Sequence, residues 1–202
     1  AYSVVGTFFR LNYGYKGRYL AEVSGRYDGN SKFPSNQRWG FFPSGSVGWR
    51  ISEENFMKNA NWLDNLKIRA SVGSAGNGLI SDAYAYLSTM SIAQSSLLNN
   101  GSVFNYTQAP SPIPKSLTWE KATTYDLGLD FEAFNGRLNF SADIYRKKTT
   151  DMYVVGEELP AVFGNSAPKG NYADMRTDGW EASLSWRDSH KVAGKTLSYN
   201  IK

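Results

Sequence analysis

The 202-residue sequence has no cysteine and only one histidine, His190. Without cysteine, a disulfide framework and a thiolate zinc site are excluded. The sequence also lacks a run of about 20 mainly apolar residues, so it predicts no transmembrane helix. One long uncharged window, residues 83–114, is rich in Ser, Asn, Gln and Pro, and this composition predicts a polar loop.

The features of a signal peptide are missing too. No segment combines a basic start, an apolar centre and a cleavage site, and the chain opens in strand-like sequence. We therefore expect an internal piece of a longer protein. The net charge of +4 and the pI near 9.1 come from scattered basic residues and not from one basic stripe, which argues against nucleic acid as a partner.

Aromatic residues are abundant in an otherwise polar chain. They make up 15% of the sequence, while the mean hydropathy is −0.45. Residues 9–15 and 19–27 alternate strictly between apolar and polar types, and strand side chains switch faces at every residue. The three residues Lys16-Gly17-Arg18 join these two strands, and a three-residue hairpin that pairs Tyr15 with Tyr19 keeps both apolar sets on one face.

The same alternation predicts six further strands. Pro43 interrupts the first of them and suggests a bulge or a strand end. A turn at Asn135-Gly136 is expected to set Glu132 opposite Arg137, and residues 52–65 have helix-turn character. The six strands are expected at residues 41–50, 66–73, 124–131, 138–145, 180–187 and 197–202.

Long and short connections take turns along the chain. The long ones lie near residues 28–38, 74–116 and 150–174, and those after the first, fifth and seventh strands are compact. Outer-membrane barrels have this asymmetry, with short periplasmic turns and long extracellular loops. The sequence therefore predicts an all-β fold, an antiparallel transmembrane β-barrel with its apolar face toward lipid. A soluble β-sandwich with a surface binding or adhesive role is the alternative, because its strands also alternate.

In a barrel, the polar face of these strands would line the lumen. Three of its carboxylates could suggest a metal site or an acid–base pair, but pairing with inward Lys and Arg across the wall is favoured. The residues expected to face the lumen are Arg10, Asn12, Glu22, Arg26, Lys67, Arg69, Asp126, Asp130, Asp143 and Glu181.

Five segments resemble one family. RLNYGYKGRYL (residues 10–20), RWGFFPSGSVGWRISEENF (38–56), NLKIRASVGSAGN (65–77), LTWEKATTYDLGLDF (117–131) and DMRTDGWEASLSWR (174–187) are similar to the barrel of SusC/RagA-type TonB-dependent outer-membrane transporters. The resemblance implies a plugged barrel of about 22 strands, of which residues 1–202 form one sector without the plug domain. It also implies import of oligosaccharides or peptides, a SusD-like surface lipoprotein as lid, and energy from TonB acting on the plug.

Catalytic chemistry has little support in the sequence. His190 is expected in the turn between the seventh and eighth strands, where a histidine is usually solvated. Asp188 and Ser189 are too close to it in sequence to suggest a Ser-His-Asp site. The sequence thus predicts neither an enzyme nor a cofactor.

Two groups of residues are candidates for contacts with other molecules. Aromatic residues in the long polar window could stack on cargo or pack on the lid protein; these are Tyr84, Tyr86, Phe104 and Tyr106. Basic residues at the outer end of the sixth strand suit lipopolysaccharide phosphates or a plain snorkelling rim; these are Arg146, Lys147 and Lys148.

Overall fold

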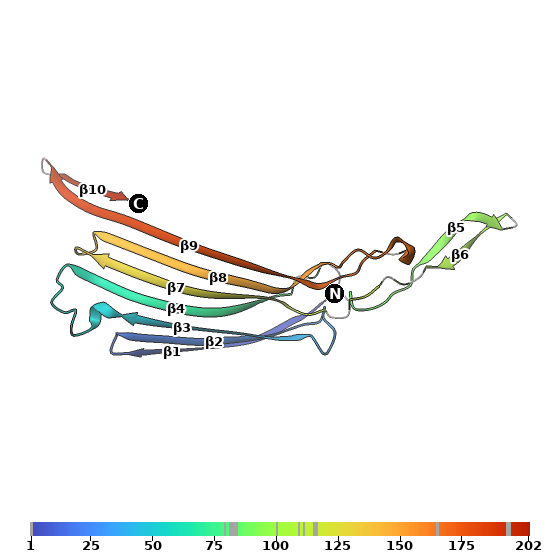
Figure 1. Cartoon of the computed structure of the whole chain (residues 1–202), viewed down its shortest axis with the longest axis horizontal. Helices are drawn as coiled ribbons and strands as arrows, with labels where there is room; N and C mark the ends of the chain where they lie inside the picture. Colours follow the sequence, from blue (N-terminus) through green and yellow to red (C-terminus); the bar gives the residue numbers. More distant parts are fainter. Residues whose placement is uncertain are drawn as a thin grey trace.

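The computed structural model describes residues 2–78, 80, 85–99, 101–108, 110, 112–114, 117–164, 166–192 and 195–202. Eight of its strands form a single antiparallel sheet, and two more form a separate hairpin (Figure 1). The large sheet contains β1 (Val4–Tyr15), β2 (Tyr19–Asn30), β3 (Trp39–Arg50), β4 (Leu63–Asn77), β7 (Glu120–Ala133), β8 (Leu138–Val155), β9 (Lys169–Val192) and β10 (Lys195–Ile201); the hairpin contains β5 (Ile92–Asn99) and β6 (Ser102–Thr107).

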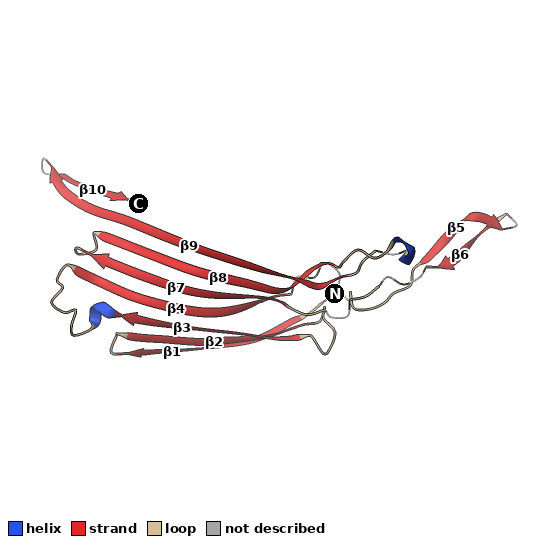
Figure 2. Cartoon of the chain, viewed as in Figure 1, coloured by secondary structure: helices blue, strands red, loops and turns tan. Residues whose placement is uncertain are grey.

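Strands of the large sheet follow one another in chain order, so the sheet is an up-and-down meander. The compact turns lie at one end and the long connections at the other, and the β5–β6 hairpin projects beyond the long-connection end (Figure 2). All eight predicted strands are confirmed. A β-sandwich would divide them between two facing sheets, whereas here they share one, and this disfavours the alternative. Within the described residues, no helix is long and apolar enough to span a membrane.

Strand pairing keeps apolar and polar side chains on opposite faces of the sheet. One row across the sheet runs through Tyr13, Ala21, Val47, Ala70, Leu127, Ile144 and Trp180, and a neighbouring row runs through Asn12, Glu22, Ser46, Ser71, Asp126, Tyr145 and Gly179. We call the faces that carry these two rows the apolar face and the polar face.

The tight turns match their sequence signals. Lys16 and Gly17 have positive φ angles of 52° and 67°, and the Arg18 N–H donates to the Tyr15 carbonyl at 3.0 Å. Tyr15 pairs with Tyr19, so the predicted three-residue hairpin is confirmed. Where helix-turn character was expected, a single 3-10 turn, η1 (Ile51–Glu53), is followed by hydrogen-bonded turns up to residue 63.

Strand lengths differ from expectation. β4, β8 and β9 extend into segments that were predicted as the loops 74–116 and 150–174, and β9 alone has 24 residues. His190 therefore lies in β9, paired with Leu197, and the prediction of a turn there is wrong. A membrane strand needs only about 9–11 residues, so strands of this length continue past a bilayer, where the apolar alternation that reveals a strand is no longer required.

Two local predictions are also wrong. Glu132 pairs with Asn139 and not with Arg137, because the turn takes up residues 134–137, with positive φ at Phe134, Asn135 and Gly136. β3 passes through Pro43 without a register shift against β2. The ladder between β3 and β4 does end at the next residue, Ser44, and a residue without an N–H is tolerated where pairing on one side stops.

The polar window between β4 and β7 holds more structure than its composition suggests. β5 and β6 pair from Ile92↔Thr107 to Asn99↔Ser102, with Gly101 at a positive φ of 80° in the turn. Within this range, Val103, Phe104 and Tyr106 are strand-forming types, and their signal was outweighed by the surrounding Ser, Asn and Gln. The 3-10 turn η2 (Ala161–Phe163) lies in the connection between β8 and β9.

Candidate functional site

The apolar face ends in aromatic residues at both rims. At the short-turn end, the ring of Tyr19 stacks between those of Tyr15 and Trp49, with centroids 6.5 Å apart in each pair. At the other end, Tyr27 stacks on Trp39 at 5.1 Å. Trp39 and Trp49 belong to the same strand and are separated by about 34 Å along it, or about 26 Å along the membrane normal at a tilt near 40°. This matches the apolar band of an outer-membrane barrel, which is about 25 Å tall.

The polar face carries an ion-pair network centred on Arg69. Its guanidinium lies 2.7 Å from Asp143, 3.2 Å from Asp130 and 3.5 Å from Asp126, so it bridges three carboxylates from β7 and β8. Gly128 makes room for it, since a Cβ there would lie 2.5 Å from Cζ of Arg69. The predicted pairing of these aspartates with basic residues of the same face is confirmed; that this face lines a lumen stays a prediction. In the part of the chain that the structure describes, no three acidic or histidine side chains are arranged to hold a metal ion.

The remaining candidate residues of the polar face form smaller pairs. Arg10 lies 3.4 Å from Glu22, Arg26 lies 2.6 Å from the buried Asp28, and Lys67 lies 3.9 Å from Asp130. Asn12 pairs in register with Glu22, and Glu181 with Asp143. A hollow of about 500 Å³ on this face is lined by Asn12, Glu22, Ser46, Lys67, Arg69 and Asp126, among others.

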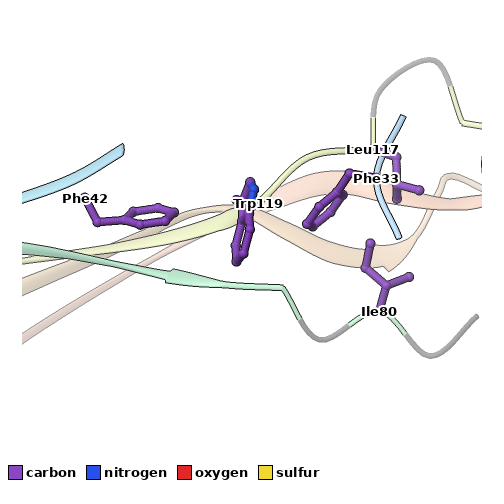
Figure 3. Packing of buried hydrophobic residues seen from close by; sticks show 5 residues of the cluster. All are labelled: Phe33, Phe42, Ile80, Leu117 and Trp119. Atoms are coloured by element: carbon purple, nitrogen blue, oxygen red, sulfur yellow. The ribbon is translucent and has the colours of Figure 1, made fainter. Parts of the chain in front are cut away.

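A buried apolar cluster lies at the long-connection end of the sheet. The sequence did not predict this cluster. Figure 3 shows its members, which come from the β2–β3 connection, β3 and the long segment between β4 and β7. Trp119 is the central ring, 5.1 Å from Phe33 and 5.5 Å from Phe42. We call it the loop-base cluster; its residues are Phe33, Phe42, Ile80, Leu117 and Trp119.

Hydrogen bonds join the connections around this cluster. The Trp119 indole N–H donates to the Arg38 carbonyl at 2.9 Å, and the Leu117 N–H donates to Oε1 of Gln37 at 2.8 Å. Asn171 exchanges two hydrogen bonds with the backbone of Thr118, at 2.9 and 3.0 Å. The β2–β3 connection, the segment before β7 and the start of β9 are thus tied together at this end of the sheet.

Glu54 organises the rim at the opposite, short-turn end. Its carboxylate accepts hydrogen bonds from the Tyr19 hydroxyl at 2.7 Å, the Trp49 indole N–H at 3.2 Å and Nη1 of Arg18 at 3.2 Å. The hydrogen bonds from Tyr19 and Trp49 lower the pKa of Glu54 below its usual value of 4.5, and the Arg18 charge lowers it further. This contact fastens the first hairpin to the connection between β3 and β4.

The lowered pKa of Glu54 predicts an acid-sensitive rim. A group with a depressed folded-state pKa stabilises the fold above its unfolded pKa, and this stability is lost as the pH falls through the folded value. We expect the thermal unfolding midpoint of the full-length protein in detergent to fall as the pH drops from 7 to below 4.5. In the Glu54→Gln variant this fall should be smaller; an equal fall in both proteins would contradict the assignment.

Residues 1–201 match the family model described as "TonB dependent receptor-like, beta-barrel". The chain belongs to this family of TonB-dependent receptors. It is 40% identical over 207 residues to the TonB-dependent receptor SusC of Bacteroides thetaiotaomicron, covering 98% of this chain and 20% of that protein. It is 38% identical over 181 residues to the TonB-dependent receptor P39 of Formosa agariphila, covering 88% of this chain and 16% of that protein.

Solved structures of the SusC/RagA type agree with this assignment. The RagAB peptide transporter superposes with a TM-score of 0.76 at 25% identity, covering 98% of this chain and 22% of the transporter chain. The RagAB peptide importer in its open-open state superposes with a TM-score of 0.78 at 27% identity, covering 94% of this chain and 20% of the importer chain. This segment of a TonB-dependent receptor thus spans about one fifth of the length of the proteins it matches.

The aromatic candidates of this receptor segment are not gathered in one place. Tyr86 is half-buried against the loop-base cluster. Phe104 and Tyr106 share one face of β6 in the projecting hairpin and are 46% and 45% exposed. Tyr84 lies outside the described residues. Among the candidates that the structure describes, Phe104 and Tyr106 are therefore the accessible ones.

The three basic candidates of β8 are divided between the two faces. Arg146 pairs with Tyr125 and Asp178 on the side of the apolar face, and Lys148 lies on the same side. Lys147 falls between them in sequence and so points to the polar face. The three candidates therefore do not share one face of the sheet, and their contact with lipopolysaccharide phosphates stays a prediction.

Proposed function

We propose that this chain is a wall sector of an outer-membrane importer that takes up oligosaccharides or peptides. The observation that carries the proposal is the two-faced sheet of a TonB-dependent receptor, with an apolar face of bilayer height and a charged polar face. The ten polar-face candidates, from Arg10 to Glu181, would then line the lumen of a plugged barrel of about 22 strands. TonB would supply energy through a plug domain encoded outside residues 1–202.

The β5–β6 hairpin is proposed to contact the surface lipoprotein that covers the barrel. Its apolar side chains are unusually exposed, and the exposed fractions are 76% for Ile92, 71% for Leu97 and 53% for Val103. Exposed apolar patches of this kind mark interaction sites in proteins that are otherwise polar. Phe104 and Tyr106 extend the patch with rings that could pack on the lipoprotein or stack on cargo.

Deleting the full-length gene tests the function. We expect uptake of either labelled oligosaccharides or labelled peptides to fall to the background level and to return with the wild-type gene. Cells without TonB should show the same loss. Recovery of the receptor in the soluble fraction, or unchanged uptake of both cargo classes, would reject the proposal.

A hairpin variant adds a test of the contact residues. Phe104→Ser with Tyr106→Ser should leave the receptor in the outer membrane, because both side chains are exposed and lie outside the large sheet. Capture of the lipoprotein by the tagged receptor should weaken, and cargo uptake should fall. If both stay at the wild-type level, these two rings have no part in lid or cargo binding.

A further inference from the structure

The apolar face ends abruptly on β7, β8 and β9. One row of that face consists of Leu127, Ile144 and Trp180, and the next row toward the long connections consists of Tyr125, Arg146 and Asp178. The row beyond contains Thr123, Lys148 and Arg176. Since successive same-face rows are about 7 Å apart along a strand, three cations lie directly above an apolar surface.

Asp178 holds two of these cations side by side. Its Oδ1 accepts a hydrogen bond from Nε of Arg146 at 2.6 Å. Its Oδ2 accepts hydrogen bonds from Nη2 and Nε of Arg176 at 2.7 and 3.0 Å. The two arginine side chains are nevertheless 55% and 57% exposed. A guanidinium has five N–H donors, so each arginine retains donors that can reach a further ligand.

The cluster keeps an excess of positive charge. Lys148 is exposed and has no ion-pair partner among the residues that the structure describes. Three cations thus face the one carboxylate of Asp178. The next carboxylate along β9, that of Asp174, accepts the backbone N–H of Asp151. A ligand with negative charge and several acceptor oxygens would complete this site, and arginine forks suit phosphate in particular.

The surface below the cations suits acyl chains. Trp180 is 74% exposed and Ile144 is 59% exposed. An open hollow of about 690 Å³ beside Arg146 is bordered by Tyr125, Leu127, Ile144 and Asp178. Snorkelling alone needs only single cations that reach headgroups independently, whereas here a carboxylate fixes two guanidiniums beside each other.

We propose that Arg146, Lys148 and Arg176 bind the phosphate groups of lipopolysaccharide, while its acyl chains lie on Ile144 and Trp180. Asp178 is a positioning residue that holds the two guanidiniums together. The inference rests on the proposed outer-membrane location, because the long-connection end must then face the outer leaflet, where this lipid resides.

Lys147 and Lys148 provide a matched pair for the test. They are neighbours in β8 with the same charge, and they point to opposite faces of the sheet. The full-length receptor, purified from outer membranes and placed in phosphatidylethanolamine nanodiscs, would be titrated with lipid A, and bound lipid counted by native mass spectrometry. We expect roughly tenfold weaker binding for Lys148→Gln with Arg176→Gln, as charge-assisted contacts are lost, and binding within about twofold of wild type for Lys147→Gln.

Two further measurements in the same experiment identify the ligand. Lipid A without phosphates should bind the wild-type receptor as weakly as intact lipid A binds the double variant, and millimolar inorganic phosphate should not displace the lipid. Displacement by free phosphate would overturn the lipid assignment. Equal binding by the double variant and Lys147→Gln in a correctly inserted receptor would overturn this inference alone. Absence of the wild-type receptor from the outer membrane would reject the proposed function and this inference together.

Discussion

Replacing Trp119 by alanine is expected to lower the free energy of unfolding of the full-length receptor by about 3–5 kcal/mol, the range for deleting a large buried aromatic side chain. Trp119 is only 9% exposed and packs on Phe33 and Phe42. Its truncation would leave a cavity where the β2–β3 and β4–β7 connections meet and would leave the Arg38 carbonyl without its indole donor. Urea unfolding in detergent micelles, followed by tryptophan fluorescence, measures the loss.

Trp119→Phe separates packing from hydrogen bonding. It keeps an aromatic ring in the cluster but removes the donor to Arg38, so we expect a loss well below that of the alanine variant. The loss in this variant should be at least the free energy of one neutral hydrogen bond, about 0.5–1.5 kcal/mol. Proteolysis of the long connections should also speed up in Trp119→Ala. An alanine variant with the stability of wild type would show that this cluster does not hold the connections together.

Placing arginine on the apolar face is the second change with a large expected effect. Ala142 lies on the apolar face of β8 between Phe140 and Ile144, in the row of Leu129 and Ala182. Arginine on the lipid face of a barrel costs up to about 2–4 kcal/mol, the value at the bilayer midplane. Ala142→Arg should therefore reduce folding into lipid vesicles and lower the free energy of unfolding by up to that amount. Urea titration of the full-length receptor in vesicles measures it.

Ser141→Arg is the matched control. Ser141 is the preceding residue of β8, points to the polar face and pairs with Asp130, whose carboxylate can accept the added guanidinium. We expect the free energy of unfolding of this variant to stay within about 0.5 kcal/mol of wild type, as for ordinary surface substitutions. If Ser141→Arg were the more damaging of the two, the assignment of the faces would be inverted.

Strand identity was accessible from the sequence because alternation is a local property. Residues 9–27 repeat with period two, and they form β1 and β2 in the predicted register. Strand ends were less accessible. β9 runs from Lys169 to Val192, and residues 169–179 do not alternate between apolar and polar types.

The loop-base cluster could not be predicted because its contacts are not local. Gln37 and Leu117 are hydrogen-bonded although 80 positions separate them. Room for the cluster depends on Gly40 and Gly76, where a Cβ would lie 2.6 and 2.0 Å from the Phe42 ring. Neither glycine stands in a turn, so nothing nearby in the sequence marks its role.

Amino-acid order by itself determined the two-faced strands, the tight first hairpin and the resemblance to SusC/RagA-type receptors. These depend on side chains that alternate along one strand and on turn residues that tolerate positive φ. Only the tertiary structure decided that Arg69 bridges three aspartates, that Arg146 and Arg176 meet at Asp178, and that Trp119 joins the long connections. Such contacts depend on the register between strands, and that register is set jointly by turns and packing far apart in the chain.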